Sequence, residues 1–311
     1  MKKYLAQVLI FGVVFLIPCF LLNVYHKKQT NDPPHYSQVF SEIEENQNNS
    51  NGIVIGSSQS GFSVKPSLLD IKDYKFYNFS MNGGGPNYFL NWYNHFFSKG
   101  PVKPKVCIYS VNSFMFEEGY LWRYFEVDSE YLSMNRFFKL FFNPKTIDTK
   151  LLIQNRIPLF KYRNNVFEKI QYFKYDLSTF DKGYISMETY AKSLAKYNPK
   201  NPRNFKFTEK QKNAFEDLIQ HLQDDGIKVI LVNTPEFGLN VEDYLDAQGM
   251  DYLISFSKQK NIPFINFNME HRDEVFNCNA QNFSDWVHLS PQGSKIFSKE
   301  LAKQVEIYLS N

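Results

Sequence analysis

Residues 53–60 read Ile-Val-Ile-Gly-Ser-Ser-Gln-Ser, and this stretch decides the fold. A short apolar run bounded by glycines is typical of a strand that is buried on both faces of a parallel sheet. The glycine after the run predicts a tight turn, which places Ser57, Ser58 and Ser60 at the end of the strand. Because sites in open α/β sheets form at the carboxyl ends of strands, these hydroxyls are candidate nucleophiles.

Strand and helix patterns alternate along much of the chain. Further strands are predicted at residues 75–80, 105–111, 227–232 and 262–267, and helices at residues 88–97, 208–223, 241–260 and 292–308. Shorter helices are expected near residues 37–45 and 67–70. Such alternation favours parallel strands with helices on both faces, so we expect a doubly wound α/β domain with a mostly parallel sheet.

Composition excludes several classes of function. The chain has 311 residues, of which 43% are hydrophobic, so it can bury a sizeable core. Its net charge of +3 comes from acids and bases mixed throughout, which gives no clustered basic face for nucleic acid. Cys19, Cys107 and Cys278 lack the spacing of a disulfide framework or a metal site, and the first two are expected to be buried. Neither a phosphate-binding nor a dinucleotide fingerprint is present, so no cofactor is expected.

The N-terminal segment predicts a membrane anchor. Residues 4–25 are almost wholly apolar, and about 20 such residues span a bilayer core. A cleaved signal peptide would have a shorter apolar core and small residues at the cut. A lipoprotein would have a small residue before Cys19, where Pro18 stands. We therefore expect a single-pass anchor with the rest of the chain outside the cytoplasm, although lysines on both flanks leave the orientation undecided.

These patterns divide the chain into three parts. Residues 1–28 form the predicted anchor, residues 29–51 a polar linker, and residues 52–311 the α/β domain. Within that domain, residues 114–206 lack a β rhythm and are dense in aromatics, so we interpret them as a largely helical insertion over the strand ends. This insertion is a lid or acceptor-binding surface, a contact with lipid or a membrane partner, or ordinary core packing.

Two further strand ends carry polar or glycine-rich segments. Residues 81–86 read Met-Asn-Gly-Gly-Gly-Pro, and Asn112 follows the predicted strand at residues 105–111. Consecutive glycines let backbone N–H groups point into a shared space, where they can bind an anion. The alternative is that the glycines form a flexible turn into the next helix.

Asp285-Trp286-Val287-His288-Leu289 lies near the other end of the chain. Ser290 and Pro291 behind it are typical of a helix start, so Asp285 and His288 lie on the loop that enters the closing helix. A spacing of three residues lets the aspartate accept a hydrogen bond from one imidazole nitrogen while the other faces a cleft. The alternative is that an isolated Asp-x-x-His arises by coincidence.

Together these residues supply the parts of an acyl-transfer site. A serine hydroxyl is a poor nucleophile until a nearby base takes its proton. His288 is the candidate base for Ser58, and Asp285 would fix its tautomer and stabilise the imidazolium. The backbone N–H groups of Ser58 and Gly83 and the side-chain amide of Asn112 are candidate donors to the oxyanion.

The order of these segments resembles the SGNH/GDSL hydrolase superfamily. That family has an early Gly-Asp-Ser block, a glycine block, an Asn block and a late Asp-x-x-His. Here Gly56-Ser57-Ser58 matches the first block with serine in place of aspartate, and residues 78–83 match the second, with Gly83 at the oxyanion glycine. Ser110-Val111-Asn112-Ser113 is the best match to the third block, and residues 283–293 match the run into the family's last helix.

The resemblance covers about residues 52–307 and implies a three-layer α/β/α fold and ester chemistry. The Gly-Ser-Ser start, the anchor and the insertion are similar to the cell-envelope branch, which includes D-alanyl transfer and polysaccharide O-acetylation proteins. The resemblance to this branch implies a membrane-anchored serine esterase or O-acyltransferase that acts on acylated cell-envelope glycans, with a membrane-bound O-acyltransferase as partner. The alternatives are a non-catalytic envelope scaffold or glycan-binding protein with this fold, and a soluble intracellular lipase.

Overall fold

A computed structural model gives the fold, and it describes scattered positions from 4 to 21 and residues 36–44, 50–98, 103–117, 132, 134–142, 149–156, 175–187, 207–238 and 247–310. The chain divides into two compact units. One unit comprises residues 1–32 with 126–173, and the other comprises residues 33–125 with 174–311. The second unit holds the sheet and the candidate site.

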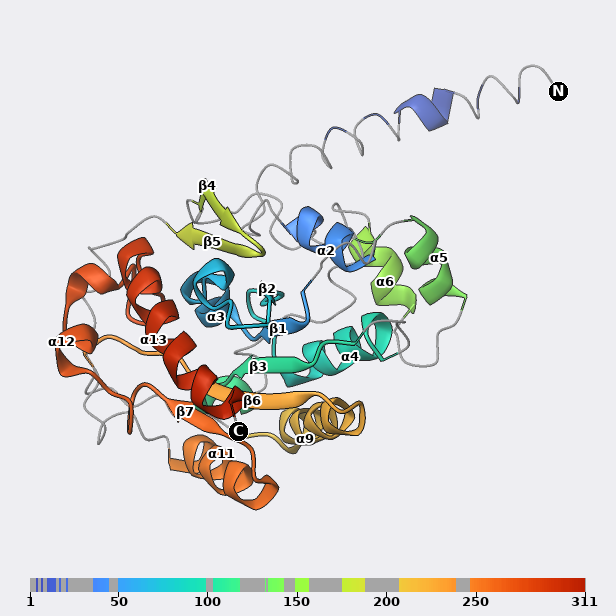
Figure 1. Ribbon diagram of the computed structural model, residues 1–311. Coiled ribbons are helices and arrows are strands. Elements are labelled where there is room, and N and C mark those ends of the chain that lie inside the picture. Colours follow the sequence, from blue (N-terminus) through green and yellow to red (C-terminus); the bar gives the residue numbers. More distant parts are fainter. Residues whose placement is uncertain are drawn as a thin grey trace. The chain divides into compact units, whose positions relative to one another are not determined.

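Parallel strands form the central sheet of the second unit (Figure 1). They are β1 (Gly52–Ile55), β2 (Phe76–Asn78), β3 (Val106–Ser110), β6 (Lys228–Asn233) and β7 (Phe264–Asn266). Their order across the sheet is β2-β1-β3-β6-β7, and every neighbouring pair is parallel. The expected α/β arrangement with a parallel sheet is confirmed, with strand ends shifted by a few residues.

The predicted helices are found in the same order. The second unit contains α2 (Tyr36–Glu44), α3 (Ser58–Ser63), α4 (Pro86–Phe96), α9 (Glu209–Asp224), α11 (Ala247–Lys260), α12 (Glu274–Asn277) and α13 (Pro291–Leu309), with 3₁₀ turns η1 (Pro66–Leu68), η2 (Ser113–Phe116) and η4 (Ala280–Asn282). The 3₁₀ turn η1 stands in place of the short helix expected at 67–70, and α3 and α12 were not predicted. The helix predicted at 241–260 is described from residue 247, because residues 239–246 lie outside the described part. In α2, the side chains of Tyr36, Val39 and Phe40 are buried.

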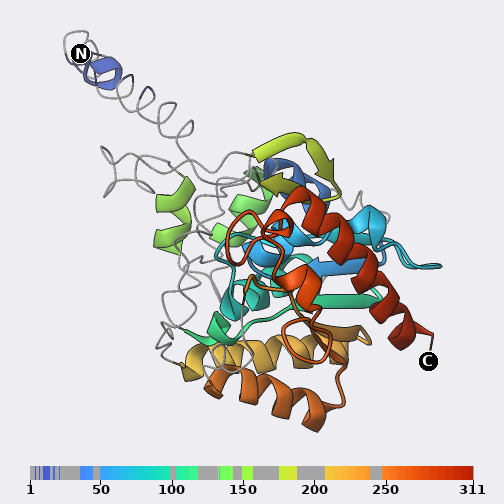
Figure 2. The same ribbon diagram turned by 90° about the vertical axis from the view of Figure 1, so that its left-hand side faces the viewer.

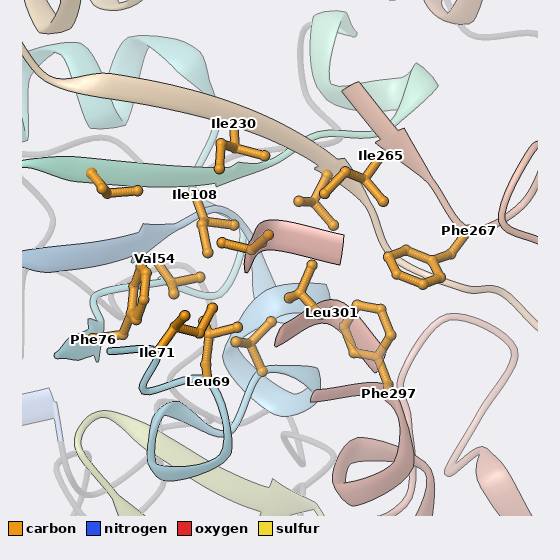
Figure 3. Packing of buried hydrophobic residues seen from close by; sticks show 14 of the residues in the cluster. Val54, Leu69, Ile71, Phe76, Ile108, Ile230, Ile265, Phe267, Phe297 and Leu301 are labelled. Carbon is orange, nitrogen blue, oxygen red and sulfur yellow. The ribbon is translucent and has the colours of Figure 1, made fainter. Parts of the chain in front are cut away.

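Strand side chains alternate between two covered faces. On one face, Val54, Ile108 and Ile230 of three neighbouring strands share a buried cluster with Phe297 and Leu301 of α13 (Figure 3). Burying a large aliphatic or aromatic side chain contributes about 1.5–3 kcal/mol, so this continuous cluster is a main source of the domain's stability.

The opposite face is aromatic. The Tyr109 ring of β3 lies 6.1 Å from Phe89 of α4 and 5.7 Å from Phe215 of α9. Phe215 lies in turn 5.1 Å from Phe256 of α11. In both ribbon views α9 and α11 lie on the side of the sheet away from α13 (Figures 1 and 2). Helices therefore cover both faces, as expected of a doubly wound sheet.

The strand order reverses between β1 and β3. From β1 the chain crosses to β2 on one side, and from β2 it returns past β1 to β3 on the other side. A ligand site in an open α/β sheet lies at the carboxyl ends of the strands where this reversal occurs. Ser58 follows β1 and Asn112 follows β3, so both candidate residues stand at this switch point.

Residues 114–206 are not simply helical, contrary to the prediction. An antiparallel hairpin, β4 (Tyr175–Asp181) and β5 (Tyr184–Met187), belongs to the second unit. Lys182 and Gly183 both have positive φ, at 46° and 89°, which is the backbone that a tight two-residue hairpin turn requires. All four residues of β5 are buried, so its sequence lacks a clear apolar–polar alternation. The helix-like spacing at 163–175 falls outside the described residues apart from Tyr175.

The first unit contains α5 (Met134–Phe141) and α6 (Thr149–Arg156). Phe137, Leu140 and Leu152 are buried, and the Arg156 guanidinium lies 5.3 Å from the centre of the Phe137 ring. Most of the predicted anchor at 4–25 lies outside the described residues. Among the positions that are described, no helix is both long enough and apolar enough to span a bilayer.

Candidate active site

The turn between β1 and α3 presents Ser58. Gly56 has φ +149°, and a side chain there would meet Ser60 Oγ at 2.5 Å and Ser110 Cβ at 2.8 Å, so only glycine fits. Ser57 and Ser60 are buried, and Ser60 Oγ is bonded to Ser80 Oγ at 2.7 Å. Ser58 alone of these serines is partly exposed, which makes it the hydroxyl that a substrate can reach.

Hydrogen bonds within the loop and at the start of α13 fix the loop that carries Asp285 and His288. The Ser284 N–H donates to the His288 carbonyl at 2.8 Å, and Ser290 Oγ caps α13 by accepting from the Gly293 N–H at 3.1 Å. Gly293 lies so close to the Asn282 carbonyl that an added Cβ would stand 2.0 Å from its oxygen. The helix start predicted at Ser290 and Pro291 is therefore confirmed, and it fixes the loop against the preceding η4 turn.

The structure brings Ser58, His288 and Asp285 into one hydrogen-bonded line. His288 Nε2 lies 2.8 Å from Ser58 Oγ, and His288 Nδ1 lies 2.7 Å from Asp285 Oδ2. The other oxygen, Asp285 Oδ1, accepts from the backbone N–H groups of Val287 at 2.9 Å and His288 at 2.8 Å. These distances are those expected of a nucleophile, a base and the group that orients the base.

The charge state of Asp285 decides the tautomer of His288. Burial by itself raises the pKa of Asp285, but the nearby His288 charge and the hydrogen bonds from the His288 ring and two backbone N–H groups outweigh it, so this pKa lies below its ordinary value. An ionised carboxylate only accepts hydrogen bonds, so Nδ1 of His288 carries the hydrogen. In the neutral ring Nε2 is then an unprotonated acceptor that faces Ser58 Oγ.

An aromatic side chain and the β4–β5 hairpin support the histidine. The Phe62 ring of α3 meets His288 edge-on at 5.4 Å and stacks on Tyr175 at 5.7 Å. The hairpin is bonded at both ends of the site: the Asn78 N–H donates to the Lys182 carbonyl at 2.8 Å, and Ser284 Oγ donates to the Met187 carbonyl at 3.3 Å. The hairpin, which sequence analysis missed, thus joins the end of β2 to the Asp-x-x-His loop.

Asn78 stabilises the start of the glycine block at residues 78–83. Its Nδ2 donates to the carbonyls of Ser60 and Val64, each at 2.9 Å, and so ties the end of β2 to α3. Gly83 has φ +68°, and no hydrogen bond from its N–H is found to any described residue. Ser58 is the first residue of α3, where N–H groups lack a partner within the helix. The backbone N–H groups of Ser58 and Gly83, which are the predicted oxyanion donors, are therefore not used in hydrogen bonds within these elements.

Asn112 is hydrogen-bonded to Gln59, the residue that follows Ser58. It is 1% exposed, and its Nδ2 donates to Gln59 Oε1 at 2.7 Å. Gln59 Nε2 donates in turn to Glu236 Oε1 at 2.9 Å. Sequence analysis named neither Gln59 nor Glu236 as a site residue. A usable signal was present, because Glu236 closely follows β6 at the same edge of the sheet.

No metal site accompanies these residues. Within the described ranges, no group of three or more His, Cys, Asp or Glu side chains is placed to hold a metal ion. Cys107 is fully buried in β3, as predicted, and burial raises the pKa of its thiol.

Comparison with known proteins gives likenesses of fold at low sequence identity. No protein-family model matches the chain, and no curated protein sequence does. Solved structures that it is similar to include a psychrotrophic esterase from Pseudoalteromonas sp. (11% identity, TM-score 0.40, covering 84% of this chain and 100% of that one). Others are a GDSL-like lipase from Bacteroides thetaiotaomicron (11%, 0.39, 87% and 99%) and a protein from Desulfitobacterium hafniense assigned to the lipolytic G-D-S-L family (10%, 0.42, 81% and 97%).

Proposed function

We propose that this chain is a serine esterase or O-acyltransferase of the SGNH/GDSL type, with Ser58 as nucleophile, His288 as base and Asp285 as the residue that orients the base. The observation that carries this proposal is the continuous line from Asp285 Oδ2 through His288 to Ser58 Oγ, with contacts of 2.7 and 2.8 Å. Residues 230 positions apart meet there at the switch point of a parallel sheet.

The proposed chemistry has two steps. Ser58 Oγ attacks the carbonyl carbon of an ester while His288 Nε2 takes its proton, and the resulting oxyanion is stabilised by N–H groups of Ser58, Gly83 and Asn112. The intermediate expels the alcohol, which receives that proton from His288, and leaves an acyl group on Ser58. Water or a sugar hydroxyl then gives its proton to His288 and attacks the acyl group. An acid or a new ester is released as Ser58 Oγ leaves and takes that proton back from His288.

The proposed setting is the cell envelope. The apolar run at 4–25 is long enough to span a bilayer and supports an anchor with the catalytic unit outside the cytoplasm. Acylated envelope glycans and a membrane-bound O-acyltransferase partner follow from the resemblance to the envelope branch. Alkaline extraction of membranes tests the anchor: a chain that stays in the membrane pellet supports it, and one released with peripheral proteins contradicts it.

Ester turnover by the full chain in detergent tests the catalytic proposal. With p-nitrophenyl acetate, Ser58→Ala and His288→Ala should each lower kcat by about 10³-fold or more, because the triad acts as a unit. Ser60→Ala is the matched control, since Ser60 Oγ is buried and bonded to Ser80, and it should keep kcat within a few-fold. Activity that survives both triad changes contradicts the proposed triad, whereas a wild-type chain with no ester turnover favours a non-catalytic scaffold with the same fold.

A further inference from the structure

A line of three buried polar side chains runs behind Ser58. Asn112 Nδ2 donates to Gln59 Oε1 at 2.7 Å, and Gln59 Nε2 donates to Glu236 Oε1 at 2.9 Å. The three residues are 1%, 2% and 1% exposed, respectively. They follow β3, β1 and β6, which are neighbouring strands, so the line crosses the carboxyl edge of the sheet and passes through the residue next to the nucleophile.

Glu236 is the fixed end of this line. Its backbone N–H donates to Asn268 Oδ1 at 2.8 Å, and its carbonyl accepts from Asn277 Nδ2 at 3.2 Å. Asn268 is itself tied back to the Thr234 carbonyl by its Nδ2 at 2.8 Å. The backbone of Glu236 is thus held on both sides by buried amide groups, which fixes the position from which its carboxylate faces Gln59.

The chemistry of the three groups imposes a direction. A side-chain amide has a donor end and an acceptor end of nearly the same shape, so it can be turned over with little steric cost. A carboxylate only accepts. Glu236 therefore holds the nitrogen end of Gln59 toward itself and the oxygen end toward Asn112. The oxygen of Gln59 in turn holds the nitrogen end of Asn112 toward the nucleophile turn.

We propose that Glu236 is a positioning residue that acts through Gln59 to keep the amide nitrogen, rather than the oxygen, of Asn112 on the side of Ser58. One N–H of that nitrogen is used on Gln59, and the second is left for the oxyanion. If Asn112 were turned over, an acceptor oxygen would stand where the oxyanion needs a donor. The proposal rests on the proposed function, in which Asn112 helps to stabilise that oxyanion.

Exchanging the Gln59 amide and the Glu236 carboxylate tests whether they set the direction of the hydrogen bonds to Asn112. Glu236→Gln keeps the shape but can present either end to Gln59, so kcat for p-nitrophenyl acetate should fall about tenfold while KM stays within about twofold. Gln59→Glu alone sets two carboxylates against each other and should lower both kcat and Tm. In Gln59→Glu/Glu236→Gln, the new Glu at 59 accepts from both neighbours, so the direction returns and kcat should recover to within about threefold of wild type.

A double-mutant cycle shows whether Glu236 acts through Asn112. Glu236→Gln added to Asn112→Ala should leave kcat within about twofold of Asn112→Ala alone, because the group that it positions is absent. An equal further loss, or a wild-type kcat in Glu236→Gln, overturns the proposal. If Glu236→Gln does not fold, the exchanged double variant decides: recovery supports the role, and a kcat as low as that of Asn112→Ala contradicts it.

The Ser58→Ala variant is measured alongside to separate this role from the proposed function. Full activity in that variant removes the proposed function and this role with it, whereas an inactive Ser58→Ala beside a wild-type Glu236→Gln removes this role alone.

Discussion

His288 Nε2 lies 2.8 Å from Ser58 Oγ, although 230 residues separate the two in the chain. Two local features make this contact possible. Gly56 turns the chain sharply at the end of β1, and the capped start of α13 holds the Asp285–His288 loop over that turn. The contact therefore depends on backbone geometry at both ends, and the predictions below test each end separately.

Asp285→Asn should cost most of the activity. An asparagine at 285 offers His288 Nδ1 both a donor and an acceptor, so it no longer enforces the tautomer that leaves Nε2 free to accept from Ser58. We expect kcat to fall by about 10³-fold or more with little change in KM. Steady-state ester hydrolysis measures this. Asp273→Asn is the matched control: Asp273 caps α12, asparagine caps about equally well, and activity should be unchanged. Equal losses in the two variants would show that the effect is not specific to the triad.

The stability contributed by Asp285 should disappear in acid. Its folded-state pKa is lowered, because the His288 charge and the hydrogen bonds from the ring and two backbone N–H groups outweigh the opposing effect of burial. The stability that comes from its charge is thus fully present above the unfolded-state pKa of about 3.9, and it is lost as pH falls through the lower folded-state pKa. The Tm difference between wild type and Asp285→Asn should therefore be largest above about pH 4 and shrink below it. Thermal unfolding from pH 5 to pH 3 measures the difference, and a gap that widens below about pH 4 contradicts this assignment.

Gly56→Ala should be much more damaging than Gly226→Ala. Both glycines have positive φ, at +149° and +74°, but a Cβ at Gly226 meets nothing within 4 Å, whereas one at Gly56 collides with Ser60 Oγ and Ser110 Cβ. The backbone cost alone is about 1–2 kcal/mol, and overpacking at Gly56 adds about 1–3 kcal/mol. Thermal unfolding compares the two variants. A Gly56→Ala protein as stable as Gly226→Ala would mean that the turn before Ser58 is not constrained as described.

Much of the fold was predictable because its signals are local. The run at 53–55, the later apolar runs and the helix start at Ser290 each depend on a few neighbouring residues, and each is found close to its predicted place. Ser58, Asp285 and His288 were predictable as a set because their order along the chain resembles a known family, while their contact required the fold.

The β4–β5 hairpin and Glu236 were not predicted, for different reasons. In the hairpin, every residue of β5 is buried, which obscures the alternation, and the turn uses Lys182-Gly183 rather than the common Asn-Gly. Glu236 closely follows β6, which marks it as a strand-end residue, but its role depends on Gln59, which lies 177 residues away and meets it only across the folded sheet. Side-chain networks of this kind follow from tertiary packing, which periodicity does not encode.

Covalent labelling with a fluorophosphonate probe tests the central claim most directly, because the probe reacts with an activated serine and needs no knowledge of the natural substrate. The full chain in detergent should form one adduct, which peptide mass spectrometry maps to Ser58. His288→Ala should label far more slowly, and Ser58→Ala should not label. An adduct on another residue, or undiminished labelling of Ser58→Ala, would contradict the assignment of Ser58 as the nucleophile.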